Sequence, residues 1–110
     1  MHELSLTRSM VELCLEHAAG RKVTSVTLQI GDLAGVEPEA MEFCFDACTA
    51  GTQLEGSRLV IERLPAAATC ADCGAAFTCS HWTAPCPSCG SLSISCQGGD
   101  ELRVKELEVE

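Results

Sequence analysis

The residues best suited to chemistry are six cysteines gathered between positions 65 and 99. Four of them form two copies of the pattern Cys-x-x-Cys-Gly: Cys70 and Cys73, then Cys86 and Cys89, with twelve residues between Cys73 and Cys86. Two thiolates three residues apart in a tight turn can bind one ion, and two such turns supply four sulfur ligands. The glycine after each pair tolerates the positive φ that such a turn tends to need. The spacing predicts a four-cysteine site, for which zinc is the preferred ion.

Two alternatives to zinc use the same four cysteines. A rubredoxin-like iron site is compatible with the second motif, and its visible colour would distinguish it from zinc. A thiol redox centre would need a thiol of depressed pKa, yet no Lys, Arg or helix N-terminus is evident beside either pair. A closed four-ligand zinc site leaves no open position for substrate, so we expect a structural metal and no enzymatic turnover.

Five further cysteines lie outside this motif pair. Cys79 and Cys96 lie in the same stretch, 65–99, which the paired motifs suggest is a zinc ribbon. They are either buried packing residues in the hairpins of this ribbon or spare ligands that exchange with the four motif thiolates. The remaining three, on apolar faces of predicted helices, are expected to belong to the core: Cys14, Cys44 and Cys48.

The extreme N-terminus, Met1-His2-Glu3, is a second candidate metal site. It offers an α-amine, the His2 amide and the His2 imidazole in fused chelate rings, and Glu3 can supply a fourth donor. Amide nitrogens coordinate only when deprotonated, which favours Ni(II) or Cu(II) in square-planar geometry. Taken alone the pattern is weak, because any residue can follow Met1 and terminal residues are commonly poorly ordered. The alternative is that His2 is a solvated terminal histidine. His81 is a lone loop histidine, an additional nickel ligand only if its loop folds toward Met1.

Charge argues against nucleic acid as a partner. Seven Lys and Arg against sixteen Asp and Glu give a formal charge of −9, which repels a phosphate backbone. The stretch 65–99 contains no Lys or Arg at all. A zinc-ribbon nucleic-acid-binding or transcription-related protein is therefore the alternative hypothesis and not the preferred one. Protein docking through Phe77, Trp82 and Leu92 suits such a ribbon better.

The chain has no apolar run of the roughly 20 residues that a membrane span needs, and its start lacks the regions of a signal peptide. We therefore expect a cytoplasmic protein with no membrane partner. Thiols stay reduced in that compartment, so nine cysteines favour metal chemistry over disulfides.

The elements that must position these residues follow from periodicity. Spacing of three and four predicts two amphipathic helices, and alternation predicts the first and last strands. A run of β-forming residues predicts the strand between them, and a bulge near Lys105 and Glu106 reconciles the two phases of the last strand. The expected elements are a helix over 4–19, a strand over 23–30, a helix from Pro38 to before Gly51, and strands over 58–64 and 102–109. The predicted fold is α/β of the α+β type: a three-stranded sheet with two helices on one face. Residues 1–64 and 100–110 form this discontinuous domain, and residues 65–99 form an inserted zinc-ribbon domain.

Several stretches together resemble a known family in order and over essentially the whole chain. They are MHELSL, LQIGDLAGVEPEAMEFCFD, the pair CADCG and CPSCG, and the closing QGGDELRVKELEVE. The chain is similar to the HypA/HybF nickel metallochaperones of hydrogenase maturation. The most specific marks are Met-His-Glu at the start and the paired Cys-x-x-Cys before the final strand.

The resemblance implies that Met1, His2 and Glu3 hold Ni(II) as transient cargo, through His2 and nearby backbone nitrogens. It implies that the four motif cysteines hold structural Zn(II). It further implies delivery of nickel to the large-subunit precursor of a [NiFe] hydrogenase with help from a maturation GTPase. Glu37 stands where some relatives place an additional acidic ligand. Cys79 and Cys96 exceed the four ligands of the family pattern.

Overall fold

The computed structural model describes residues 2–82 and 84–110, with the side chain of His2 left out of the description. Contacts divide the chain into two compact units. The first comprises the chain as far as Gln29 together with Val36–Glu62 and Arg103–Glu110, and the second comprises Ile30–Gly35 and Arg63–Leu102. The domain limits predicted from sequence, 1–64 with 100–110 and 65–99, stay a prediction.

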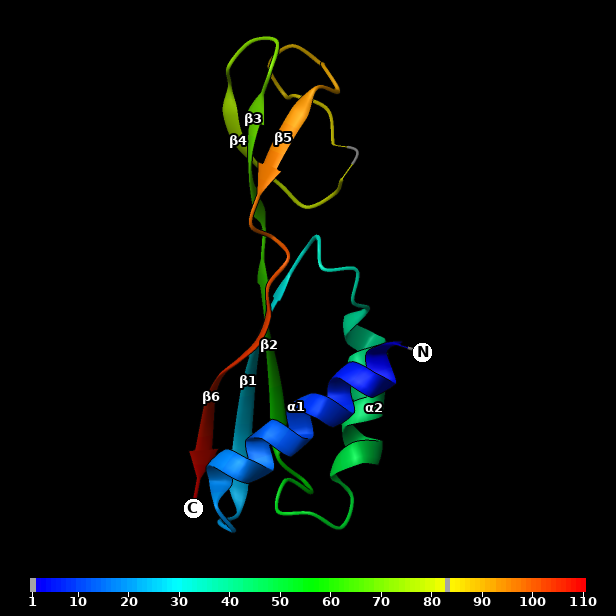
Figure 1. The fold of residues 1–110 in the computed structure, drawn as a ribbon, viewed down its shortest axis with the longest axis vertical. Helices are drawn as coiled ribbons and strands as arrows, with labels where there is room; N and C mark the ends of the chain where they lie inside the picture. Colours follow the sequence, from blue (N-terminus) through cyan, green and yellow to red (C-terminus); the bar gives the residue numbers. More distant parts are fainter. Residues whose placement is uncertain (1, 83) are drawn as a thin grey trace. The chain divides into compact units, whose positions relative to one another are not determined.

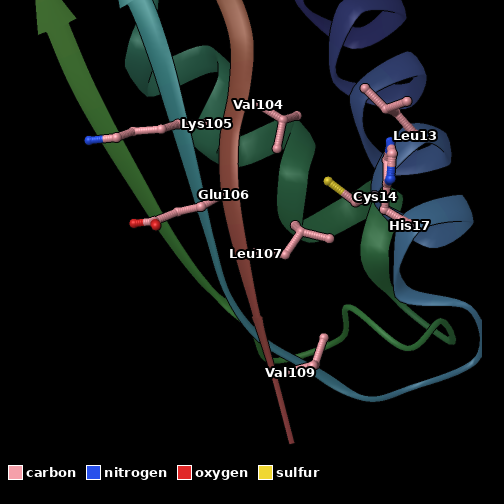
Figure 2. A pocket seen from close by; sticks show the side chains of 8 residues that line it. All are labelled: Leu13, Cys14, His17, Val104, Lys105, Glu106, Leu107 and Val109. Carbon is pink, nitrogen blue, oxygen red and sulfur yellow. The ribbon is translucent and has the colours of Figure 1, made fainter.

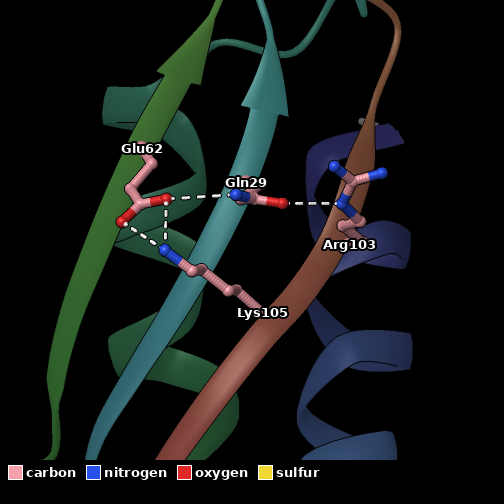
Figure 3. A network of polar contacts seen from close by, with 4 residues as sticks. All are labelled: Gln29, Glu62, Arg103 and Lys105. Atoms are coloured by element: carbon pink, nitrogen blue, oxygen red, sulfur yellow. Dashed lines mark hydrogen bonds and ion pairs between the residues drawn. The ribbon is translucent and has the colours of Figure 1, made fainter.

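The first unit is built from two helices and a three-stranded mixed sheet. The helices are α1 (His2–Ala18) and α2 (Pro38–Thr49), and the strands are β1 (Val23–Gly31), β2 (Arg58–Leu64) and β6 (Leu102–Val109). The strand order is β2-β1-β6. Figure 1 shows β1 and β2 running in the same direction, with α2 between them in the chain and β6 running the opposite way. Both helices cover one face of the sheet, which confirms the predicted fold class (Figure 3).

Apolar periodicity explains how the helices attach to this sheet. The central strand β1 is almost wholly buried, and α1 and α2 turn residues at three- and four-residue spacing toward it. The buried apolar residues of these three elements include Val11, Cys14, Ala18, Val23, Val26, Leu28, Met41 and Phe45. The prediction that Cys14 is a core residue is thereby confirmed. Burial raises the pKa of the Cys14 thiol to about 11, so it stays protonated at neutral pH.

Helix α1 begins two residues earlier than the periodicity predicted, at His2 instead of Leu4. Glu3 in the first turn complements the positive end of the helix dipole, and this favours extending the helix to the start of the chain. The helix ends at Ala18, and both Ala19 and Gly20 adopt positive φ. His2 lies in the first turn of α1, the part of a helix whose N–H groups are outside the i→i−4 hydrogen-bond pattern.

The change of phase predicted in the last strand is present in β6. Two consecutive residues, Lys105 and Glu106, are exposed, whereas the residues on either side are partly buried. In Figure 2, Val104 and Leu107 point toward α1, and Lys105 and Glu106 point away from it. The extra residue lets both ends of β6 turn apolar side chains toward the helices.

The exposed face of the sheet carries a polar network across all three strands (Figure 3). The Gln29 side-chain amide on β1 donates to Glu62 on β2 over 3.2 Å, and its carbonyl accepts from Arg103 on β6 over 2.7 Å. Lys105 forms an ion pair of 3.2 Å with Glu62. The Gln29 and Lys105 hydrogen bonds lower the pKa of the Glu62 carboxyl.

The second unit contains a small antiparallel sheet of β3 (Ala66–Cys70), β4 (Ala76–Cys79) and β5 (Ile94–Gln97), in the order β4-β3-β5. Its core is small: Leu33, Ala66, Ala68 and Cys79 are buried, with Phe77, Ala84, Ile94 and Cys96 packed against them. Phe77, one of the three residues proposed for docking, is partly buried against this core. Trp82 and Leu92 are exposed, at 69% and 75% of their surface.

Backbone hydrogen bonds join the loop after β1 to the two segments that lead into and out of this small sheet. The Asp32 N–H donates to the Leu64 carbonyl over 2.8 Å, and the Leu33 N–H donates to the Gly99 carbonyl over 2.6 Å. Arg63 adds an ion pair of 3.0 Å with Asp32. At Gly31 the approach is so close that a Cβ would lie 2.0 Å from the Gly99 carbonyl oxygen.

We predict that Gly31→Ala lowers the free energy of unfolding by at least about 2 kcal/mol, because backbone must move to admit the methyl group. Gly35→Ala in the same loop is the matched control. A Cβ added at Gly35 would have no atom within 4 Å, and the φ of this residue is +73°, so we expect a cost of about 1 kcal/mol from backbone strain. Urea unfolding followed by circular dichroism measures both, and equal costs for the two variants would contradict the close approach.

Candidate metal sites

The four motif cysteines meet at one point in the second unit. All four Sγ atoms lie within 4.8 Å of one another. The distance is 3.6 Å between the sulfurs of Cys70 and Cys89 and 3.6 Å between those of Cys73 and Cys86. A tetrahedral zinc ion with Zn–S bonds of about 2.3 Å sets its sulfurs about 3.8 Å apart. Both of these sulfur–sulfur distances are close to the separation that a tetrahedral zinc ion requires.

The two motifs fold into matching turns. The Gly74 N–H donates to the Cys70 carbonyl over 2.9 Å, and the Gly90 N–H donates to the Cys86 carbonyl over 2.8 Å. Both glycines have a φ of 76°, as the motif predicted. Each turn contributes two thiols, and the four sulfurs lie within 4.8 Å of one another.

Backbone N–H groups lower the pKa of the first thiol in each turn. The N–H groups of Cys89 and Ser88 lower the pKa of Cys86 to about 6. Those of Cys73 and Asp72 lower the pKa of Cys70. Thiolate is the form that binds metal, so these contacts favour metal binding at neutral pH.

The second thiol in each turn behaves differently. For Cys89, the Ser91 N–H acts to lower the pKa, but the neighbouring Cys70 side chain, burial and the other thiols raise it to about 12. The pKa of Cys73 is raised as well: the Ala75 N–H lowers it, but the adjacent Cys86 thiol and burial raise it more. Four sulfurs this close cannot all ionise without a cation between them, and a bound dication removes that conflict.

A side-chain contact joins the two turns, and nothing in the motif spacing signals it. The Ser91 hydroxyl donates to the Asp72 carboxylate. The same Ser91 oxygen accepts from the Ser93 N–H over 3.1 Å. These bonds help hold the two halves of the site in register across nineteen residues of chain.

Cys79 and Cys96 lie apart from the four-cysteine group. Their sulfurs are 3.5 Å from each other, on strands that flank the alanines of β3. Cys79 is 4% exposed within the apolar cluster, and burial and the Cys96 side chain raise its pKa. A protonated, buried thiol is a poor ligand, so the surroundings of Cys79 favour the packing interpretation for this residue over the spare-ligand one.

At the N-terminus the structure brings two predicted candidates together. Met1 and the His2 side chain lie outside the described residues. Glu3 lies in the first turn of α1, and its carboxylate accepts a hydrogen bond of 3.3 Å from the backbone N–H of Glu37. Glu37 is exposed and directly precedes Pro38, the first residue of α2. The periodicity placed Glu3 and Glu37 on separate elements and had no means of bringing them into contact. His81 is exposed and belongs to the second unit.

Comparison with known proteins extends over the whole chain. A family model described as hydrogenase/urease nickel incorporation, metallochaperone, hypA matches residues 1–109. The chain belongs to this HypA family of nickel metallochaperones. The resemblance inferred from the sequence motifs is thereby confirmed.

Curated relatives of this chain agree over their full length. A hydrogenase maturation factor HypA from Geotalea uraniireducens is 57% identical over 100% of both chains. Another from Geobacter metallireducens is 56% identical, also over 100% of both. The solution structure of the nickel metallochaperone HypA from Helicobacter pylori shares the fold, with a TM-score of 0.64 at 24% identity over 97% of this chain and 96% of that one. A second solution structure of a HypA protein gives 0.66 at 25% identity, over 100% and 97%.

HypA proteins carry a metal and do not turn over a substrate, so the family agrees with the expectation that this chain is not an enzyme. The four-cysteine cluster is its evident metal site, and the donor set suggests zinc. Among the described residues, no helix has both the length and the apolar content that crossing a membrane demands.

We predict that Cys73→Ser leaves the purified protein with far less than one zinc per chain, because the site loses one of its four thiolates. Cys79→Ser, the matched control in the same unit, is expected to retain its zinc. Metal analysis after dialysis against a chelator makes the comparison. Loss of zinc from the Cys79→Ser protein would instead identify Cys79 as an exchanging ligand.

Proposed function

We propose that this chain binds Ni(II) at its N-terminus and delivers it to the large subunit of a [NiFe] hydrogenase during maturation. The observation that carries the proposal is the family match, which runs from the Met-His-Glu terminus to residue 109. Full-length relatives named hydrogenase maturation factors support the choice of enzyme. Nickel is cargo in this scheme, and zinc is resident.

The proposed nickel ligands are the Met1 amine, the His2 amide and imidazole, and Glu3. The start of α1 at His2 supports this set, because the N–H groups of the first helical turn are not used in helix hydrogen bonds. An amide that is free of such a bond can lose its proton to Ni(II) without breaking the helix. Nitrogen donors in a plane suit Ni(II) better than Zn(II), which prefers a tetrahedron.

The contact between Glu3 and Glu37 supports a role for both carboxylates. The hydrogen bond from the Glu37 N–H holds the Glu3 side chain against the start of α2. It thereby ties the first turn of α1 to the residue proposed as the additional acidic ligand. Two carboxylates beside the terminal amine attract a dication electrostatically, and either can occupy a coordination position. His81 is an added candidate, and the proposal rests on the first unit alone.

The four motif cysteines hold the proposed resident zinc, whose role is to keep the inserted 65–99 module folded. The site is closed, so zinc there supplies no catalytic position. Exposed Trp82 and Leu92 on this module are the proposed docking residues for partner proteins, namely the maturation GTPase and the hydrogenase large-subunit precursor. The cytoplasm, where the thiols stay reduced, is the proposed location.

We predict that zinc-loaded protein with its native terminus binds nickel at least about 100-fold more tightly than a version with one extra residue before Met1, since outer-shell losses alone cost roughly 10–100-fold. His2→Ala should lose affinity by a similar factor. Isothermal titration with Ni(II) measures each constant. Equal affinity in all three proteins would remove the terminal site from consideration, and an unchanged zinc content in His2→Ala would show that the two metals bind separately.

The role of Glu37 calls for its own comparison. We predict that Glu37→Gln weakens nickel binding by about tenfold, through loss of a nearby negative charge or of a ligand. Glu39→Gln removes the same charge two residues further along, in the first turn of α2, and should leave the affinity within about twofold. The same nickel titration compares the two variants. Equal losses of affinity would show that Glu37 acts only through its general negative charge and not as a ligand.

A further inference from the structure

The outer edge of β6 has no strand beside it in the described part of the chain, because β6 ends the order β2-β1-β6. A groove of about 420 Å³ runs between this strand and α1 (Figure 2). Val104, Leu107 and Val109 turn toward the groove from β6, and Leu13 borders it from α1 with 43% of its surface exposed. Unpaired backbone groups beside an apolar groove are suited to accept another strand.

The order of side chains along β6 indicates that the added strand is β6 of a second copy of the chain. The strand has basic residues at positions 103 and 105, acidic residues at 106 and 108, and apolar residues between and around them. When two copies of β6 are placed antiparallel about the point between Lys105 and Glu106, Arg103 faces Glu108 of the other copy. Lys105 then faces Glu106. Every charge meets the opposite sign, and cross-strand pairs of opposite charge stabilise a sheet.

The bulge makes this register fit both faces of the strand. In a regular strand, residues an odd number of positions apart point to opposite faces of the sheet. The pairs Arg103–Glu108 and Lys105–Glu106 are an odd number apart, so in a regular strand their side chains would lie on different faces. The two consecutive exposed residues at the centre of β6 shift the phase, and its burial pattern is the same from either end. Val104 and Leu107 therefore lie on the same face of the joined sheet, and so do Arg103 and Glu108.

Electrostatics favours this strand over the rest of the surface. Two chains of charge −9 repel each other, so a contact between copies requires a locally neutral surface. The two basic side chains of β6 balance its acidic side chains at 106 and 108. Charged residues on an edge strand ordinarily prevent pairing, but here each one meets a partner of the opposite sign. Among the described residues, the carboxylates of Glu106 and Glu108 have no side-chain partner, so pairing breaks no ion pair of theirs.

We propose that β6 is a homodimer interface, in which two copies of this chain pair antiparallel through their outer β6 edges and join their three-stranded sheets into one. The groove beside each edge closes over apolar side chains near the two-fold axis. The inference is independent of nickel binding and stands on the strand order, the groove and the charge pattern.

Sedimentation equilibrium of the full-length, zinc-loaded protein over a range of concentrations tests the proposal. The native protein is expected to form a concentration-dependent dimer. Arg103→Glu and Glu108→Arg each place like charges opposite one another at two symmetric positions, so each should raise the dissociation constant by about tenfold or more. Glu42→Arg, on an exposed position of α2, makes the same charge change as Glu108→Arg away from β6 and should not weaken the dimer.

The decisive sample is an equimolar mixture of the two single variants. The new acidic side chain at position 103 of one chain then faces the new basic side chain at position 108 of the other. The native Glu108 of the first chain faces the native Arg103 of the second, so a heterodimer of native strength should form. The double variant Arg103→Glu/Glu108→Arg should likewise restore the homodimer.

Three outcomes would overturn the proposal. The first is a native protein that stays monomeric at every concentration. The second is a pair of single variants that dimerise as strongly as the native protein. The third is a pair of weakened single variants that the mixture does not rescue, because a loss that opposite charges cannot repair does not arise from this pairing.

Discussion

The geometry of the second unit depends on four thiolates held within a few ångströms of one another. Its apolar core consists largely of alanine and cysteine side chains, which bury little surface and contribute little hydrophobic free energy. Without a cation the four sulfurs cannot all ionise, since each turn holds one thiol of lowered pKa and one of raised pKa. Metal binding resolves both problems, because the free energy of a structural zinc site, roughly 10–16 kcal/mol, is folding free energy.

The two proposed metal sites differ in the property that their roles require. The cysteine site uses soft thiolates on four positions of two rigid turns, so its ion is held from all sides and is not exchanged readily. The terminal site would use nitrogen donors from one helical turn and carboxylates at the start of another element. Ligands from one end of the chain leave the ion accessible to an acceptor, which suits cargo that must be given up.

Local chemistry could be predicted from the sequence, and contacts between distant segments could not. Pro38 marked the start of α2, and a run of β-forming residues marked β2 over 58–64, because both signals act within a few residues. The spacing of the motif cysteines predicted the cluster for the same reason. Phe77 was proposed only as a docking residue, and the sequence did not show that it also packs against a core formed by residues from separate segments of the chain. The contact between Glu3 and Glu37 likewise spans thirty-four residues and follows from the packing of α1 against α2.

Strand β6 shows how one inserted residue can serve two requirements. Its inner face must present apolar side chains to the helices at both ends, and a strictly alternating strand of this sequence would bury either Lys105 or Glu106. The bulge keeps both charges exposed, on the side where Lys105 also reaches Glu62. The same insertion makes the pattern of apolar and charged residues symmetric about its centre. The bulge at Lys105 and Glu106 is therefore explained by core packing alone, and it also makes the edge of β6 self-complementary.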